Sequence, residues 1–141
     1  MKPTILLDTG PLVALFYRRD AHHAWAAQQI GRLPTPLLTC EPVITEASFL
    51  LHRLVGSATP AIEFIQTGAL QLAFNLADEL AAVHNLMKHY ADVPMSLADA
   101  CLVRMSELHA NSVVLTTDSD FAIYRKHRRQ TIPTLMPPAD R

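Results

Sequence analysis

The sequence contains only two cysteines, Cys40 and Cys101, and both lie in apolar stretches. Two thiols are too few for a disulfide framework or a zinc ribbon, so we expect both to be reduced and the protein to be cytoplasmic. No apolar run approaches the roughly 20 residues needed to cross a bilayer. No basic segment leads into a long apolar stretch near the N-terminus, so neither a signal peptide nor membrane contact is expected.

Several motifs of well-known enzyme classes are also absent. The sequence has no H-E-x-x-H, no G-x-S-x-G, no G-x-x-x-x-G-K-[ST] and no G-x-G-x-x-G. These absences disfavour zinc peptidases, serine hydrolases of the α/β type and proteins with phosphate-cradling loops. Adjacent His22 and His23 point about 100° apart on a helix, so the pair cannot hold one ion from a single face.

A strong excess of one charge is missing as well, because the formal net charge is −1. Nothing in the overall charge therefore indicates binding to nucleic acid. The segment YRKHRRQ is a local exception, and its basic residues are Arg125, Lys126, Arg128 and Arg129. Such a charge run is either a solvated helix end or loop, or a contact site for RNA phosphates.

What the sequence does contain is a regular alternation of strand and helix patterns across its 141 residues. Half of these residues are hydrophobic, which is enough for one substantial core, and we expect a single domain over 1–141. The patterns predict strands at 3–7, 37–40, 69–74, 112–117 and 131–136, and helices at 11–18, 20–30, 42–55, 60–67, 76–90 and 96–110. Alternating strands and helices favour a three-layer α/β/α domain with a mainly parallel central sheet.

Acidic residues follow two of the predicted strands. Asp8 comes directly after the first strand and Asp118 after the strand over 112–117, with Asp120 as a second candidate in the same loop. In parallel sheets ligands bind at the carboxyl ends of the strands, so these acids can share one edge. Each can instead be a simple helix N-cap. Asp8 also begins Asp-Thr-Gly, the signature of dimeric aspartic proteases.

Two further acids lie on predicted helices. Glu46, in EPVITEASFLLHRL, falls at the border of an apolar face, where a carboxylate needs either a basic partner or a cation. That face is formed by Val43, Ile44, Ala47, Leu50, Leu51 and Leu54. Asp99, in SLAD, fits a capping box with Ser96 as N-cap, and from the first turn its side chain can lean toward the strand ends.

The ordered stretches ILLDTGPLVALF, VITEASFLL, PMSLADACLVRM and VVLTTDSDF resemble the PIN-domain nucleases, and within them the VapC-type toxins. The resemblance implies a PIN-like α/β fold and a ribonuclease that uses Mg²⁺ or Mn²⁺. It assigns metal binding and catalysis to Asp8, Glu46, Asp99 and Asp118, and matches Thr116 to a hydroxyl residue before the fourth acid. It also implies an RNA substrate, a homodimer and a cognate antitoxin protein of a type II toxin–antitoxin pair.

Two other functions compete with this hypothesis. The first is a PIN-like module that binds RNA or protein without cutting, although such a module need not keep all the acids. The second is the aspartic protease, which requires an all-β domain. The helices predicted after Asp-Thr-Gly argue against it.

Overall fold

The computed structural model describes residues 2–139. Its main sheet has five strands in the order β3-β2-β1-β4-β7, and all neighbouring strands in it are parallel. The strands are short, and their bounds are β1 Thr4–Leu7, β2 Leu37–Thr39, β3 Leu70–Leu72, β4 Ser112–Leu115 and β7 Thr134–Leu135. The sheet agrees with the predicted parallel arrangement and excludes the all-β fold that an aspartic protease needs.

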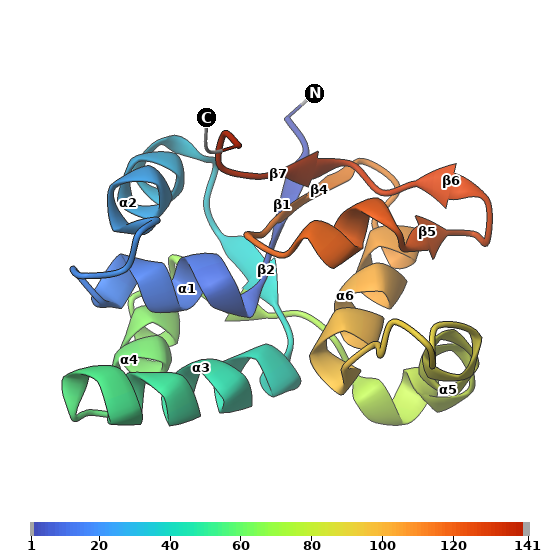
Figure 1. Cartoon of the computed structure of the whole chain (residues 1–141), viewed down its shortest axis with the longest axis horizontal. Coiled ribbons are helices and arrows are strands. Elements are labelled where there is room, and N and C mark those ends of the chain that lie inside the picture. Colours follow the sequence, from blue (N-terminus) through green and yellow to red (C-terminus); the bar gives the residue numbers. More distant parts are fainter. Residues whose placement is uncertain (1, 140–141) are drawn as a thin grey trace.

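Helices flank this sheet on both sides (Figure 1). The helices are α1 Thr9–Phe16, α2 His23–Arg32, α3 Glu41–Val55, α4 Pro60–Gln66, α5 Leu80–His89 and α6 Leu97–Leu108. Short 3₁₀ turns, η1 Leu76–Glu79 and η2 Ser119–Ala122, precede α5 and follow β4. The observed architecture is the predicted α/β/α arrangement around a parallel sheet.

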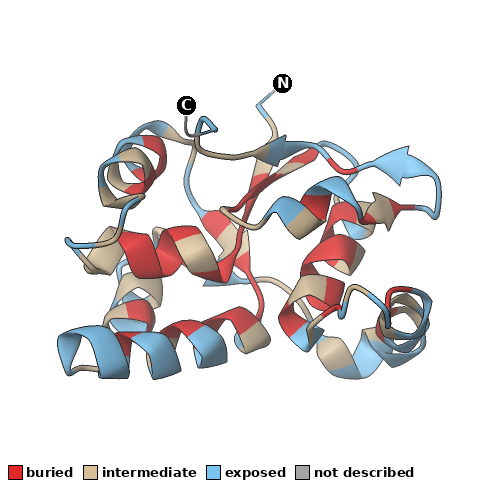
Figure 2. Ribbon diagram, viewed as in Figure 1, coloured by how far each residue is buried: buried red, intermediate tan, exposed pale blue. Residues whose placement is uncertain are grey.

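The hydrophobic core lies along the central strands and the helix faces that cover them (Figure 2). Leu6, Leu7 and Leu115 are fully buried on β1 and β4, as expected for strands covered on both faces. Leu102 and Met105 of α6 are also fully buried. Packing in this buried core fixes the positions at which β1 and β4 end.

Local sequence signals set most helix ends. Pro42 and Pro60 lie in the first turns of α3 and α4, where a missing N–H costs nothing. Gly56 ends α3 in a left-handed conformation, with φ of 78°. Ser96 caps α6 by accepting the Asp99 N–H at 3.0 Å, as the capping box predicts.

Some predicted boundaries and faces were wrong. Helix α1 begins at Thr9 because Asp8 caps it, whereas α2 begins only at His23 because Asp20 binds the His22 N–H in a preceding turn. Leu50 and Leu54 do not join the apolar core face of α3 and are 39% and 44% exposed. Helices α1, α4 and α6 pack against α3 and cover a narrower stripe of it than the helical wheel alone suggested.

The basic segment near the C-terminus forms a small hairpin, which the sequence patterns did not predict. Strand β5, Arg125–Lys126, pairs antiparallel with β6, Gln130–Thr131. The connecting turn places His127 and Arg128 at positive φ, 50° and 69°. The structure therefore makes this segment a strained turn and not a helix end.

Within residues 2–139, none of the helices combines the length and the apolar character that crossing a membrane requires.

Candidate active site

The candidate site lies where the strand order of the sheet reverses. Beginning from central β1, the chain continues to β2 on one side, while β4 pairs on the other side. The carboxyl ends of two such strands diverge toward different helices and leave a crevice between them. Asp8 follows β1, and Thr116 and Asp118 follow β4, so the topology brings them to this crevice.

Asp8 occupies the centre of this crevice and is only 5% exposed. Its Oδ1 accepts the Thr9 N–H at 2.8 Å, and its Oδ2 accepts the Thr116 hydroxyl at 2.6 Å. Burial raises the pKa of Asp8 to about 7, the charges of Asp99 and Asp118 add to the rise, and the hydrogen bonds oppose it. Ionised Asp8 is therefore held in a place that disfavours its negative charge.

Asp99 lies at the start of α6 and faces the same acidic cluster. Its Oδ2 accepts a hydrogen bond from the Tyr124 hydroxyl at 2.8 Å. Burial raises the pKa of Asp99, the tyrosine hydrogen bond opposes this, and the nearby charge of Asp118 adds to it. Tyr124 is fully buried, so it orients Asp99 from inside the protein.

Asp118 completes the group and also has a local role. Its Oδ1 accepts the Asp120 N–H at 2.9 Å and so caps η2, while its own N–H donates to Thr116 Oγ1 at 2.9 Å. Thr116 thus connects the backbone of Asp118 to the carboxylate of Asp8. Asp120 contributes a backbone contact here, and its carboxylate lies near enough to add to the rise in the pKa of the Tyr124 hydroxyl, whose main cause is burial.

Glu46 lies at the outer margin of the cluster. It is exposed on α3, where the prediction had placed it at the edge of the core, and its Oε2 accepts the Thr9 hydroxyl at 3.0 Å. Because Thr9 also donates its N–H to Asp8, this threonine bridges the two acids. Glu46 is not among the charges that shift the pKa of Asp8. The structure therefore gathers Asp8, Asp99 and Asp118 and leaves Glu46 at their rim.

Two supporting residues have roles that sequence reasoning missed or only partly anticipated. Tyr124 had no recognisable signal, since it is the first residue of the basic segment YRKHRRQ. Gly10 appeared in the sequence only as part of Asp-Thr-Gly, but a Cβ built on it would lie 2.1 Å from Thr117 Oγ1. Glycine at position 10 therefore allows the start of α1 to approach the loop that carries Asp118.

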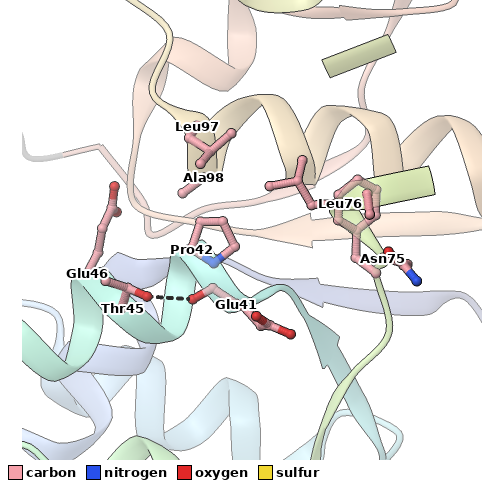
Figure 3. Close-up of a pocket in the computed structure, with 10 residues that line it drawn as sticks. Glu41, Pro42, Thr45, Glu46, Asn75, Leu76, Leu97 and Ala98 are labelled. Atoms are coloured by element: carbon pink, nitrogen blue, oxygen red, sulfur yellow. Dashed lines mark hydrogen bonds between the residues drawn. The ribbon is translucent and has the colours of Figure 1, made fainter. Parts of the chain in front are cut away.

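A cavity of about 720 Å³ opens beside the acids, between the start of α3, η1 and the start of α6. Figure 3 shows Glu46 on one side of it and Leu97 and Ala98 on the opposite side. Of the four candidate acids, Glu46 lines this cavity, and Ala98 in its lining immediately precedes Asp99. Its walls also include Pro42 and Leu76, which give it a partly apolar lining.

The side chains at this site match the chemistry of a hard divalent cation. All of them offer oxygen, which Mg²⁺ and Mn²⁺ prefer, and the buried charge of Asp8 calls for a positive partner. In residues 2–139, however, no three acidic, histidine or cysteine side chains are already arranged around one ion position. Binding a cation would therefore require some of these side chains to move toward one another.

The structure separates the basic residues that were predicted as one set. Lys126 is buried and its Nζ points to the Ala110 carbonyl at 3.5 Å. Arg125 is partly buried and donates through Nη1 to nearby carbonyls. Arg128 and Arg129 are exposed in the β5–β6 turn.

Comparisons with known proteins agree with this fold. Ribonuclease VapC26 of Mycobacterium tuberculosis is 25% identical over 116 residues, which cover 81% of this chain and 86% of that protein. The crystal structure of M. tuberculosis VapC20, described as a sarcin-ricin loop cleaving toxin, superposes with a TM-score of 0.78 at 22% identity. The match covers 85% of this chain and 94% of VapC20 and shows that the two share a fold. Residues 5–126 match the PIN domain family, and the chain therefore belongs to that family.

Proposed function

We propose that this chain is a divalent-metal-dependent endoribonuclease and the toxin of a type II toxin–antitoxin pair, acting in the cytoplasm as one domain over 1–141. The observation that carries the proposal is the burial of Asp8 beside Asp99 and Asp118 at the reversal of strand order. A fold does not need three mutually repelling carboxylates in one crevice, whereas a metal-dependent nuclease does. The ribonuclease and toxin names of its relatives support the same activity.

In this proposal Asp8, Glu46, Asp99 and Asp118 hold Mg²⁺ or Mn²⁺, directly or through water. When bound, such an ion activates water and stabilises charge on a phosphate during in-line displacement. Thr116 and Tyr124 donate hydrogen bonds to Asp8 and Asp99 and so orient these carboxylates. The cavity beside Glu46 provides space for the substrate next to the acids.

Cleavage of RNA by purified protein tests this function directly. We expect RNA to be shortened in Mg²⁺ or Mn²⁺, and cleavage to stop with chelator and to fall at least about 100-fold in Asp8→Asn and Asp99→Asn. Asp92→Asn is the matched control, because Asp92 is an exposed acid outside the site, and this variant should cleave like the parent.

Cleavage that survives chelation, or that survives both site substitutions, would contradict the proposal. Retention of RNA without shortening would instead favour the non-cleaving PIN-like binding module.

The partners implied by this function are also proposals. An antitoxin that inhibits the enzyme should bring a basic side chain to the acidic cluster, because the uncompensated charge there is negative. The proposed homodimer has a candidate surface on α3, where apolar side chains such as Phe49 are exposed.

A further inference from the structure

A second cavity, of about 440 Å³, lies between the end of α5 and the β5–β6 hairpin. Its lining contains Lys88, His89, Arg125 and Arg128. We propose that this cavity, called here the basic cavity, binds a backbone phosphate of the RNA strand whose scissile phosphate lies at the acidic site. The inference rests on the proposed ribonuclease function and adds a second contact point for the same substrate.

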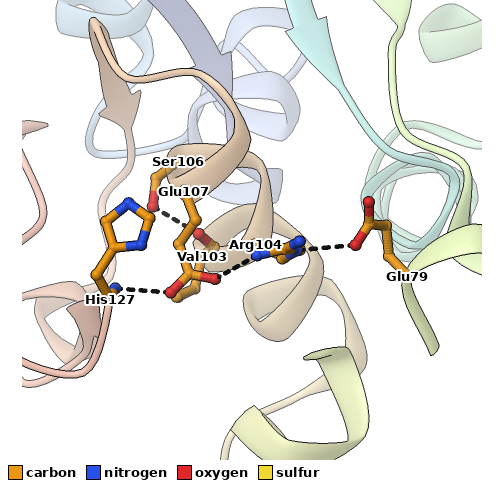
Figure 4. A network of polar contacts seen from close by, with 6 residues as sticks. All are labelled: Glu79, Val103, Arg104, Ser106, Glu107 and His127. Carbon is orange, nitrogen blue, oxygen red and sulfur yellow. Dashed lines mark hydrogen bonds and ion pairs between the residues drawn. The ribbon is translucent and has the colours of Figure 1, made fainter. Parts of the chain in front are cut away.

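The charge of the basic cavity favours an anion. Glu107, the acidic residue in its lining, is already engaged: Oε1 pairs with Arg104 at 3.2 Å, and Oε2 accepts the His127 N–H at 2.7 Å. Figure 4 shows this network, in which Arg104 also pairs with Glu79 at 2.8 Å. Because Arg104 is shared by Glu79 and Glu107, this network keeps one negative charge, which is less than the positive charge of Lys88, Arg125 and Arg128 together.

Arg125 is held in place before any ligand arrives. Its Nη1 donates to the carbonyls of Ala122, Ile123 and Tyr124, at 2.7, 3.1 and 2.9 Å, and its backbone N–H donates to Tyr90 Oη at 2.9 Å. An anchored guanidinium loses little freedom on binding a phosphate and can offer its other N–H groups in a fixed direction. The site is thus partly preorganised.

The hairpin turn presents Arg128 at a conformational cost. His127 and Arg128 both adopt positive φ, a region that glycine enters freely and that bulkier residues rarely occupy. Strained non-glycine residues concentrate at functional positions. A turn chosen for stability alone would place glycine or asparagine here, whereas this one carries an exposed cation.

The basic cavity lies close enough to the acids for one strand to reach both. Tyr90 lines the cavity, and its ring packs against that of Tyr124 with centroids 5.1 Å apart. The Tyr124 hydroxyl in turn donates to Asp99. The two tyrosines therefore connect the basic cavity to the acidic cluster.

RNA binding by charge variants tests the inference. The assay measures fluorescence anisotropy of a single-stranded RNA of about 16 nucleotides, the upper end of common site sizes. It uses Asp8→Asn protein, so that RNA stays intact, over a range of salt concentrations. Lys88→Glu should raise Kd about tenfold and lower the salt slope by about 0.7 for each phosphate that the protein no longer neutralises.

Arg128→Gly separates the charge from the fold. Glycine relieves the positive φ, so we expect an unchanged or higher melting temperature together with weaker RNA binding. The matched control is Arg19→Glu, an exposed change equal in charge to Lys88→Glu. It lies after α1, at the other end of the molecule from α5 (Figure 1), and should alter Kd less than about twofold.

Each other outcome has a definite meaning. If Lys88→Glu and Arg19→Glu weaken RNA binding equally, binding depends only on the net charge of the protein, and the inference is overturned. Inorganic phosphate that binds the parent and is lost in Lys88→Glu, while Lys88→Glu leaves RNA binding unchanged, would assign the cavity to a free anion and also overturn the inference. Normal binding by Lys88→Glu and Arg128→Gly, with a parent that cleaves RNA, removes this inference alone. A parent that neither binds nor cuts RNA removes the proposed function as well.

Discussion

At the scale of single residues, Asp8 combines a structural and a chemical role in one carboxylate. Oδ1 caps α1, and Oδ2 is held by Thr116 beside Asp99 and Asp118. Helix capping and metal binding are often treated as competing explanations of an acid after a strand. In this protein the helix cap fixes the position of the Asp8 carboxylate. In that position the carboxylate is repelled by the charges of Asp99 and Asp118.

The raised pKa of Asp8 predicts a dependence of stability on pH. The folded pKa, about 7, exceeds the unfolded value of 3.8, so this group does not oppose folding below about pH 4 and opposes it increasingly up to pH 7. Above pH 7 the cost is on the order of 4 kcal/mol. Metal-free Asp8→Asn should therefore be more stable than the parent at pH 8 and similar near pH 4, as measured by urea unfolding.

The control for this measurement is Asp92→Asn, an exposed acid whose substitution should change the free energy of unfolding little at either pH. An Asp8→Asn protein less stable than the parent at pH 8 would contradict the assigned burial cost.

At the scale of elements, the site depends on how closely α1 approaches the loop after β4. Gly10 lies in the first turn of α1, and Thr117 lies in that loop. Their contact leaves no room for a Cβ at position 10. The distance between Asp8 and Asp118 is therefore controlled by a residue that lies outside the proposed metal and substrate contacts.

Gly10→Ala should destabilise the protein by about 1–3 kcal/mol and reduce RNA cleavage, because the new methyl pushes on Thr117. Adding Thr117→Ala removes the atom at 2.1 Å and should restore most of both losses. Thermal unfolding and cleavage rates measure the two effects.

Gly31→Ala is the matched control, since a Cβ there meets nothing within 4 Å and α2 should gain about 0.5–1 kcal/mol from alanine. If Gly10→Ala and Gly31→Ala have the same stability and the same cleavage rate, the close contact between Gly10 and Thr117 is not important for function.

Local chemistry explains which elements could be predicted from the sequence. The apolar strand followed by Asp8 and the Ser96 cap of α6 involve neighbours in the chain and were confirmed, whereas β4 ends at Leu115, two residues before the predicted end of the strand that precedes Asp118. The contact of Tyr124 with Asp99 and of Gly10 with Thr117 joins residues far apart in sequence, and no single-sequence pattern encodes it. The metal-binding roles assigned through the family resemblance stay predictions.

At the scale of the whole molecule, one helix carries an apolar surface that the core does not use. Phe49, Leu50, Leu54 and Val55 of α3 are 60, 39, 44 and 42% exposed. Large apolar side chains that a folded chain leaves exposed are candidates for a protein interface. This face fits the proposed homodimer.

Sedimentation equilibrium tests this surface. We expect the parent to be dimeric and Phe49→Lys with Leu54→Lys to be monomeric, with an unchanged fold because both side chains are exposed. Ile123→Lys is the control, since Ile123 is 53% exposed at the end of η2 and away from α3. A monomeric parent, or a dimeric double variant, would reject the α3 face as the interface.

The buried carboxylate at the end of β1 has one more consequence. Because burial raises the pKa of Asp8 to about 7, a proton and a cation compete for its oxygens near neutral pH. Metal binding then exchanges a proton on Asp8 for the cation. Acidifying the medium therefore weakens metal binding. The fraction of enzyme that holds a metal ion would therefore fall as the pH falls, even in the absence of RNA.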